Sequence, residues 1–284
     1  MLVNLQPSTS RVPVNVSAYI PCFNNRRTIA EVIASVRQQT VAVHEIVVVD
    51  DASTDGSPEV ARAAGARVAI QPSNLGRGPA RRRGMEETSA QFVVSCDATY
   101  VIPPDYLARA KVWMERPEVG AVYGRISQEQ GGDAVTRWRG RHLFKVGAPK
   151  CPATEVSSFA TTGSIVRRSA VEAVGNYDAS LRHTEDAELG SRLIRGGWKI
   201  ICDPDLVVYS VAQNSLGQVL ERYWRWHAGV DERLSFGGYL RKIWFSIRCM
   251  APHDLREGDP AAALISLLLP HAQLWRTLFS SKKP

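Results

Sequence analysis

The chain has 284 residues, of which 44% are hydrophobic and 22% are charged. These values are typical of globular proteins and exclude disordered and collagen-like chains. A chain of this length can bury a full core as one large domain, or as one domain with a small appendage. Its net charge of +7 would suit nucleic acid, anionic lipid or phosphate-bearing substrates and does not choose among them.

The ends and the cysteines give expectations about location. Residues 1–13 are polar and punctuated by proline, without the charged and then apolar pattern of a signal peptide. The longest apolar run, 261–269, is shorter than the ~20 residues of a membrane-spanning helix. Five cysteines at wide spacings, with no C-x-x-C pair, predict reduced and mostly buried thiols and no structural zinc site. We therefore expect a cytoplasmic protein.

Apolar runs alternate with helix-like segments through the first hundred residues. Strands are predicted at 14–20, 45–50, 67–71 and 92–96, and helices at 28–39, 57–64 and 79–89. This alternation indicates βαβ units and a parallel sheet.

The second half is less regular. Residues 125–158 are polar and predict an insertion that faces the site. The pattern loosens after 119–123 and becomes regular again at 161–168. Strands are predicted at 199–201 and 206–209, and helices at 184–195 and 215–229, followed by a helical tail.

Ligands of parallel sheets collect at the carboxyl ends of the strands. Asp50 and Asp51 leave the most continuous β-branched run, and an acid there can accept hydrogen bonds from a ribose or a base. A dehydrogenase or methyltransferase would use such an acid too, but it would carry a glycine-rich turn after the first strand. Residues 21–26 read P-C-F-N-N-R instead, and the only G-x-G, at 76–78, follows the third strand.

Seven short motifs follow one another in register. They are P-x-F-N at 21–24, V-V-D-D-x-S-T-D at 48–55, N-x-G and A-R at 74–81, an Asp97 turn before P-D-x-L at 104–107, G-S and R-R at 163–168, G-N-Y-D at 175–178, and E-D-x-E-L-x-x-R-L-x-x-G at 185–196. Together they resemble the signature of family 2 inverting glycosyltransferases. The resemblance extends over residues 14 to about 228.

The resemblance implies an α/β fold of the GT-A type, a Rossmann-like and mostly parallel sheet flanked by helices. The expected organisation is a polar segment at 1–13, a GT-A domain at 14–228 and a basic helical extension at 229–284. Within the domain, 14–124 would be the nucleotide-binding half and 125–228 the acceptor half.

The resemblance also implies roles for single residues toward a nucleoside diphosphate sugar. Asp51 would accept from the base or ribose, with Pro21 and Phe23 shaping the base pocket. Arg81 would approach the diphosphate, and Asp97 would lie on the ribose–phosphate side. Further substrate contacts are expected at Asn24, Asp50, Asn74, Gly76, Arg77 and Gly163.

Asp186 would be the general base, with Glu185 beside it. Inverting transfer needs a base for the acceptor hydroxyl and a group that stabilises the departing nucleoside diphosphate. Repulsion between the two neighbouring carboxylates can raise the pKa of Asp186 toward the working pH. The alternative explanation of the pair is favourable placement at a helix N-terminus.

Two departures from the family concern metal binding. The family turn normally reads D-x-D, whereas here Thr99 stands at the last position, and Ser210 stands where a histidine is common. We therefore expect Mg²⁺ or Mn²⁺ to be bound weakly, with Asp97 as the remaining ligand, or to be dispensable. Arginines suit the leaving diphosphate, and candidates occur at 77, 81, 82 and 83, with a solvated basic face as the alternative for Arg82 and Arg83.

The C-terminal part leaves several readings open. The run 222–226, R-x-x-R-W, resembles the element with which processive members hold an acceptor or leaving group, through Arg225 and Trp226; packing against the core explains it equally well. Beyond Gly237, aromatic and basic residues are interleaved. This tail could be an interfacial membrane element, a helical hairpin that closes the domain, or a homodimer contact.

The leading function is transfer of a sugar from a nucleotide donor to a saccharide, lipid-linked or small-molecule acceptor, in cell-envelope or polysaccharide synthesis at the inner face of the membrane. The main alternative is a catalytically inactive relative that binds nucleotide sugar or glycan, because the metal ligands are missing. Retention of Asp51, Arg81, Asp97 and Asp186 together favours activity. No nucleic-acid-binding motif is found.

Overall fold

The computed structural model describes residues 15–129, 131–149, 151–227 and 234–279, with only the backbone described at 225–227. The chain divides into two compact units. The first comprises residues up to Ile126 and Pro149–Ala212, and the second comprises Ser127–Ala148 and Gln213 onward.

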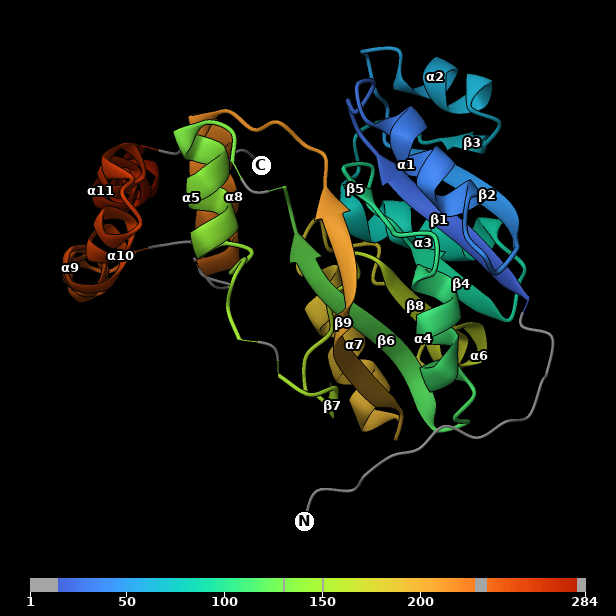
Figure 1. The fold of residues 1–284 in the computed structure, drawn as a ribbon. Coiled ribbons are helices and arrows are strands. Elements are labelled where there is room, and N and C mark those ends of the chain that lie inside the picture. The colour runs from blue at the N-terminus through green and yellow to red at the C-terminus, as the bar shows by residue number, and fades with distance from the viewer. Residues whose placement is uncertain (1–14, 130, 150, 228–233, 280–284) are drawn as a thin grey trace. The chain divides into compact units, whose positions relative to one another are not determined.

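The first unit contains a mixed sheet with strand order β3-β2-β1-β4-β8-β6-β9-β5, and β7 pairs with β9 (Figure 1). Its strands are β1 (Val16–Cys22), β2 (Val43–Asp50), β3 (Arg67–Ile70), β4 (Phe92–Ser95), β5 (Tyr100–Val101), β6 (Val119–Ser127), β7 (Thr154–Glu155), β8 (Ser164–Arg167) and β9 (Lys199–Ser210). Strands β1 to β4 run parallel, whereas β8 runs antiparallel to both β4 and β6. The predicted α/β sheet is thus parallel in its first half and mixed in its second.

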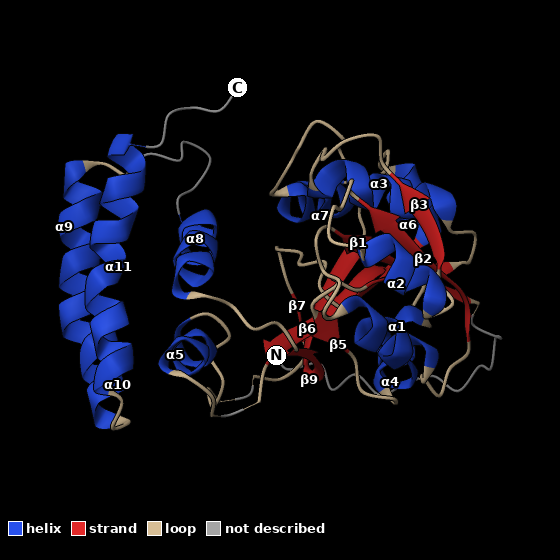
Figure 2. Ribbon diagram, turned by 90° about the horizontal axis from the view of Figure 1, so that it is seen from above, coloured by secondary structure: helices blue, strands red, loops and turns tan. Residues whose placement is uncertain are grey.

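Six helices of the described residues flank this sheet. They are α1 (Ile29–Arg37), α2 (Ser57–Ala63), α3 (Arg77–Glu87), α4 (Tyr106–Met114), α6 (Arg168–Ala173) and α7 (Glu185–Arg195). Figure 2 shows α3, α6 and α7 on one side of the sheet and α1, α2 and α4 on the other. Both faces of the sheet are therefore covered, as expected for parallel strands.

The core of this unit explains the continuous apolar run of β2. Val47, Val48 and Val49 are all 0% exposed, because successive side chains point to opposite faces and both faces carry helices. Val47 and Val49 belong to the same apolar cluster as Leu189 and Leu193 of α7. This packing holds α7, which carries the predicted base, against the sheet.

Some predicted boundaries in this unit were wrong. The two strands predicted at 199–201 and 206–209 are one strand, β9, that continues through Pro204. Asp203 stabilises the continuous strand, since its carboxylate accepts hydrogen bonds from the Trp113 indole at 2.8 Å and from the Asp205 amide at 2.9 Å. Helices α4 and α6 were not predicted.

The second unit is helical. Its helices are α5 (Ala134–His142), α8 (Leu216–His227), α9 (Phe236–Phe245), a π-helical turn η1 (Ser246–Met250), α10 (Ala251–Arg256) and α11 (Pro260–Phe279). The elements α9, η1 and α10 follow one another without interruption, and α11 lies beside α9 (Figure 2).

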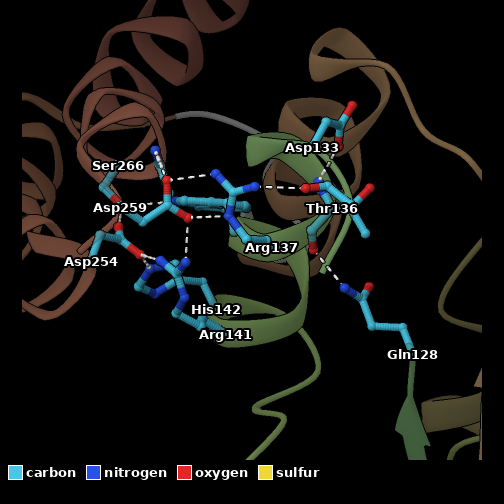
Figure 3. Close-up of polar contacts among 12 residues, drawn as sticks. Gln128, Asp133, Thr136, Arg137, Arg141, His142, Asp254, Asp259 and Ser266 are labelled. Atoms are coloured by element: carbon cyan, nitrogen blue, oxygen red, sulfur yellow. Dashed lines mark hydrogen bonds and ion pairs between the residues drawn. The ribbon is translucent and has the colours of Figure 1, made fainter. Parts of the chain in front are cut away.

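Buried ion pairs connect α5 to the C-terminal helices (Figure 3). Arg137 donates to both carboxylate oxygens of Asp259 at 2.6 and 2.9 Å. Arg141 pairs with Asp254 and Asp259, which are 0% and 4% exposed. The burial of both aspartates means that each needs these cations.

These ion pairs also explain why the units differ from the domain boundaries expected from the sequence. The predicted insertion 125–158 contains α5, and α5 and α8 group with the C-terminal helices rather than with a domain that ends at residue 228. The basic residues of α5 are typical of a solvated surface, and their acidic partners lie more than a hundred residues further along the chain.

The cysteines and the helices test two smaller expectations. All five thiols are free, but only Cys22 and Cys96 are buried, and Cys151 and Cys249 are exposed, so the expectation of mostly buried thiols was wrong. Among the helices that the structure describes, none combines the length and apolar character of a membrane span.

Candidate active site

The candidate site lies where the carboxyl ends of β1, β2 and β4 meet the amino end of β8. Asp51 follows β2, Asp97 follows β4, and Gly163 precedes β8. The Gly163 amide donates to the Ser95 carbonyl at 2.8 Å, which joins the last two of these loops. This is the edge at which parallel sheets bind ligands.

Asp51 organises the loop after β3. Its Oδ1 accepts from the Gln71 side chain at 2.9 Å and from the Leu75 amide at 2.8 Å, and its Oδ2 accepts from the Gly76 amide at 2.9 Å. The side chain is 5% exposed. A nucleoside that bonds to Asp51 would share or replace these partners, and the predicted nucleoside contact stays a prediction.

Asp50 is even more buried, at 1% exposure. Its Oδ2 accepts from the Ser53 amide at 2.9 Å, and its Oδ1 has no hydrogen-bond partner among the described residues. Burial, together with the charge of Asp50, raises the pKa of the adjacent Cys22 thiol to about 12. Cys22 is therefore a neutral thiol at physiological pH.

The first loop is tied to the second. Asn24 has a left-handed φ of 54°, its amide donates to Ser53 Oγ at 2.8 Å, and its side-chain oxygen accepts from the Thr54 amide at 2.9 Å. Pro21 is half-buried, and Phe23 leaves 45% of its surface exposed. An aromatic ring at this edge is available for stacking on a base.

Arg81 is the centre of the polar network in this unit. Its Nε donates to Glu185 at 2.9 Å, Nη1 donates to Ser95 Oγ at 2.6 Å and Nη2 donates to Asp97 at 2.7 Å. Arg81 is 1% exposed and Glu185 2% exposed. The guanidinium thereby connects α3, β4 and the start of α7.

This network fixes the charge of Asp97. Burial is the largest effect and by itself would raise the pKa of this carboxyl, but the charges of Arg81 and Arg77 and the hydrogen bonds from Thr162 and Arg81 together outweigh it, and the pKa lies below its ordinary value. The second carboxylate oxygen of Asp97 accepts from Thr162 Oγ1 at 2.8 Å. Asp97 is consequently an ionised and well-held carboxylate.

The neighbouring arginines differ in access. Arg77 is exposed at the start of α3. Its positive charge is one of the effects that act to lower the pKa of Asp97 and of Asp186. Arg82 donates to the Tyr177 carbonyl and Arg83 to the Ile70 carbonyl. Since Arg81 is almost fully buried, Arg77 is the more accessible guanidinium for an anionic ligand.

Asp186, the predicted base, lies at the start of α7 and is partly exposed. Burial and then the negative charge of Glu185 raise its pKa above the ordinary value, against the opposing effect of Arg81. The preceding Thr184 has φ 65°, which is unusual for a β-branched residue and is the kind of backbone strain that collects at functional sites. A raised pKa is the direction of shift that a general base needs, and the predicted base role of Asp186 stays a prediction.

The glycines of the G-x-G motif let the segment before α7 approach α3 closely. The Gly78 amide donates to the Leu181 carbonyl at 3.1 Å, and a Cβ at Gly78 would lie 2.1 Å from that oxygen. Arg182 also donates to the Asn74 side chain at 2.6 Å. The motif therefore brings Asn74 and Arg77 toward the start of α7.

The side chains present do not form a metal-ligand set. Both oxygens of Asp97 are engaged by Arg81 and Thr162, and Ser210 Oγ is buried without a hydrogen-bond partner. No three His, Cys, Asp or Glu side chains in the described part of the chain group as metal ligands. A cation at this site would depend on oxygens of the donor.

The remaining predicted residues lie in the second unit. Arg225 and Trp226 fall on the helical backbone of α8, but their side chains lie outside the described residues. Tyr223 packs against Trp138 with ring centroids 5.7 Å apart, and the Arg276 guanidinium lies 5.4 Å from the Trp224 ring.

Three polar residues of the candidate site, Ser95, Thr162 and Gln71, were not predicted from the sequence, because no spacing distinguishes them from ordinary polar residues.

Comparison with known families follows the same outline. The sequence model described as glycosyl transferase family 2 matches residues 17–175. The chain is 22% identical over 242 residues to poly-beta-1,6-N-acetyl-D-glucosamine synthase of Staphylococcus epidermidis, a match that covers 82% of this chain and 57% of that protein. It is 29% identical over 209 residues to succinoglycan biosynthesis protein ExoA of Rhizobium meliloti, covering 67% and 61%. The chain spans less than two thirds of either relative.

Solved structures show the same GT-A fold. A mannosyltransferase from Pyrobaculum calidifontis, in complex with GDP-Man and Mn²⁺, superposes with a TM-score of 0.58 at 19% identity, over 97% of this chain and 75% of that one. Residues 1–349 of S. aureus TarS, in complex with UDP-GlcNAc, superpose with a TM-score of 0.56 at 17% identity, over 93% and 89%. The predicted GT-A architecture is confirmed.

Proposed function

The chain belongs to glycosyl transferase family 2, and on this premise we propose that it transfers a sugar from a nucleoside diphosphate donor to a hydroxyl acceptor with inversion at the anomeric carbon. The observation that carries the proposal is the partly exposed Asp186, whose pKa is raised by burial and by Glu185, on a helix tied through Arg81 to the sheet edge. The nucleotide sugars bound by the mannosyltransferase and TarS structures support the donor class.

The transfer needs one proton acceptor and one leaving group. Asp186 takes the proton of the acceptor hydroxyl while the hydroxyl oxygen attacks the anomeric carbon. The bond from that carbon to the diphosphate breaks on the opposite face, and its electron pair leaves with the nucleoside diphosphate. Because a base works best when its pKa approaches the working pH, the raised pKa of Asp186 favours this role.

Positive charge near the leaving group comes from the arginines in this proposal. Arg77 is exposed and contacts the diphosphate directly. The sequence also predicted a contact between Arg81 and the diphosphate. Arg81 can make this contact only if its guanidinium gives up its ion pair with Asp97 or with Glu185. The nucleoside lies against Phe23 and Pro21, near Asp51. Because the side chains present form no metal-ligand set, no step is assigned to a metal, and we propose weak or absent metal dependence.

The names of the relatives support the acceptor class. The poly-N-acetylglucosamine synthase and the succinoglycan protein are both named for polysaccharide synthesis, which supports a saccharide or lipid-linked acceptor. We propose that the reaction takes place at the cytoplasmic side of the membrane.

Replacement of the base tests the mechanism. Asp186→Asn should lower kcat by ~10²-fold or more, the usual contribution of a positioned base, with unchanged donor affinity by calorimetry. Glu188→Gln is the matched control, because Glu188 lies on the same helical turn but pairs with Arg192, and it should keep its activity. Turnover by Asp186→Asn close to that of the unmodified protein would rule out the assignment. Donor binding without turnover for every donor and acceptor tried would instead indicate an inactive relative.

A further inference from the structure

Helices α9 to α11 bury polar side chains and expose large apolar ones. Ser246, Asp254, Ser266 and Gln273 are at most 3% exposed. The exposed fractions of large apolar residues are Phe236 74%, Leu240 49%, Trp244 60%, Ile247 54%, Leu264 56%, Leu268 45%, Trp275 65%, Leu278 65% and Phe279 63%. Helix α11 also buries Ile265 and Leu269, but so many exposed large apolar residues are unusual for helices that only pack on a core in water.

Most of the exposed apolar residues form stripes on both helices, while Phe245 and Leu255 are exposed outside the stripes. On α9 and η1 they recur at positions 236, 240, 244 and 247, and on α11 at 264, 268, 275 and 278, spacings that keep them on one side of each helix. Two contacts fix the antiparallel register of the helices: Tyr239 Oη with His271 Nδ1 at 2.9 Å, and Ser246 Oγ with the Ser266 carbonyl. This register places Phe236 level with Trp275 and Ile247 level with Leu264.

The polar contacts of the hairpin lie between its helices or toward α5, not among the exposed stripes. Ser266 Oγ accepts from the Trp138 indole at 2.8 Å and donates to Asp254 at 2.6 Å. The side-chain atoms of Gln273 are buried without partners among the described residues. The apolar side chains are exposed rather than turned toward this polar interior, and the aromatic rings of Trp275 and Phe279 lie against each other with centroids 4.3 Å apart.

The accessible charge around these stripes is positive. Arg241, Arg248 and Arg256 are exposed, and the Arg248 guanidinium lies 5.9 Å from the Trp244 ring. Among the three acids of α9 to α11 and their connections, Asp254 and Asp259 are buried under Arg137 and Arg141 (Figure 3). Of these three acids, Glu257 alone is exposed. Because the other two are buried, the surface of these helices is more basic than their amino-acid composition indicates.

We propose that the exposed stripes of α9, η1 and α11 dock on an anionic lipid bilayer. We refer to these nine residues, Phe236, Leu240, Trp244, Ile247, Leu264, Leu268, Trp275, Leu278 and Phe279, as the apolar face. Apolar patches of this size mark lipid or protein contacts. Tryptophan favours the bilayer interface, and arginines beside an apolar stripe are attracted to anionic headgroups.

Charge complementarity selects lipid over a second copy of the chain. In a twofold dimer through the apolar face, each copy would bring its own exposed arginines to the same contact. Like charges would then face each other around the interface, which is unfavourable. Anionic headgroups instead supply the opposite charge along the whole border of the face.

The test measures binding and is independent of catalysis. The full chain is mixed with vesicles of phosphatidylcholine alone, or of equal parts phosphatidylcholine and phosphatidylglycerol, and the bound fraction is measured by flotation at low and high salt. We expect binding to the anionic vesicles, weakened by salt, and a blue shift of tryptophan fluorescence on binding. Absence of binding to anionic vesicles at low salt would overturn the proposal.

Two sets of variants separate the apolar and basic parts. Trp244→Glu with Trp275→Glu should lower the partition coefficient at least tenfold. Arg241→Gln with Arg248→Gln should lower it by roughly 30-fold, since each of the two basic residues near the surface contributes on the order of 1 kcal/mol. Val112→Glu is the matched control, because Val112 is an exposed apolar residue of α4 in the first unit. Circular dichroism checks that each variant is folded. If Trp244→Glu with Trp275→Glu abolished a dimer seen by light scattering and left vesicle binding unchanged, the apolar face would be a protein interface and the proposal would be wrong.

Discussion

Replacement of Arg81 by methionine tests the buried network most directly, because the side chain keeps an unbranched apolar stem and loses the charged guanidinium. The change removes three hydrogen bonds and leaves Glu185, which is 2% exposed, without its cation. Removal of one partner of a buried ion pair costs ~3–5 kcal/mol. A typical domain has only ~5–15 kcal/mol of stability in total. We therefore expect a large loss of stability.

Related variants distinguish charge from geometry. Arg81→Lys keeps the charge, but one ammonium cannot span Glu185, Ser95 and Asp97 as the guanidinium fork does, so an intermediate loss is expected. Combining Arg81→Met with Glu185→Gln removes the stranded carboxylate and should recover part of the stability. Arg82→Met is the control, because Arg82 pairs with Glu86 on an exposed helical surface, and such pairs contribute ~0.3–0.5 kcal/mol. Its hydrogen bond to the Tyr177 carbonyl adds ~0.5–1.5 kcal/mol, so the loss should stay below that of Arg81→Met.

Urea unfolding followed by circular dichroism and tryptophan fluorescence measures these differences. The reasoning predicts that Arg81→Met is the most destabilised, followed by Arg81→Lys and then Arg82→Met. A loss for Arg81→Met no larger than that for Arg82→Met would refute it. A double variant with Glu185→Gln that is as unstable as Arg81→Met alone would show that the unpaired carboxylate is not the cause.

Three further perturbations have defined outcomes. The folded chain binds the proton of Asp186 more tightly than the unfolded chain does, because the pKa is raised on folding. The ionised carboxylate therefore destabilises the folded chain at neutral pH, and Asp186→Asn should raise the Tm measured by calorimetry. This gain should vanish below about pH 4, where the carboxyl becomes protonated in both states. Gly84→Ala would place a Cβ 2.4 Å from the Tyr19 ring and should cost ~1–3 kcal/mol in urea unfolding, whereas Gly237→Ala, with no atom within 4 Å, should be neutral or stabilising by up to ~1 kcal/mol. Donor turnover should keep most of its rate in a chelator, and complete loss restored by Mg²⁺ or Mn²⁺ would contradict the weak metal dependence proposed from Thr99 and Ser210.

The first half of the sheet was predictable, because strands and helices alternate there along the chain. A continuous β-branched run identifies β2, and alternation with helical segments places Asp51 and Asp97 at one edge of a parallel sheet. The repulsion expected from Glu185 has the predicted direction, but burial, which the sequence did not predict, is the larger cause of the raised pKa of Asp186.

What remained hidden depends on tertiary contacts. Three consecutive arginines at 81–83 look alike in the sequence, and only the approach of β4 and α7 makes Arg81 buried while Arg82 and Arg83 stay near the surface. The same holds for α5, whose arginines resemble a solvated face until Asp254 and Asp259 are placed beside them. The exposed side of α9 and α11 depends on the helices against which they pack, and the amino-acid composition of the tail does not predict these partners.

During synthesis, the two partners of each ion pair in the second unit leave the ribosome at different times. Arg141 emerges 113 and 118 residues before Asp254 and Asp259, with which it pairs. At the ~5–20 residues per second of ribosomal synthesis, α5 waits roughly 6 to 24 seconds for these carboxylates, while the strands of the first unit are complete by Ser210. During that interval Arg137 and Arg141 have not yet met these carboxylates. Synthesis of Asp254 and Asp259 therefore acts as the timing step for the second unit, and chains released earlier would carry α5 without its acidic partners.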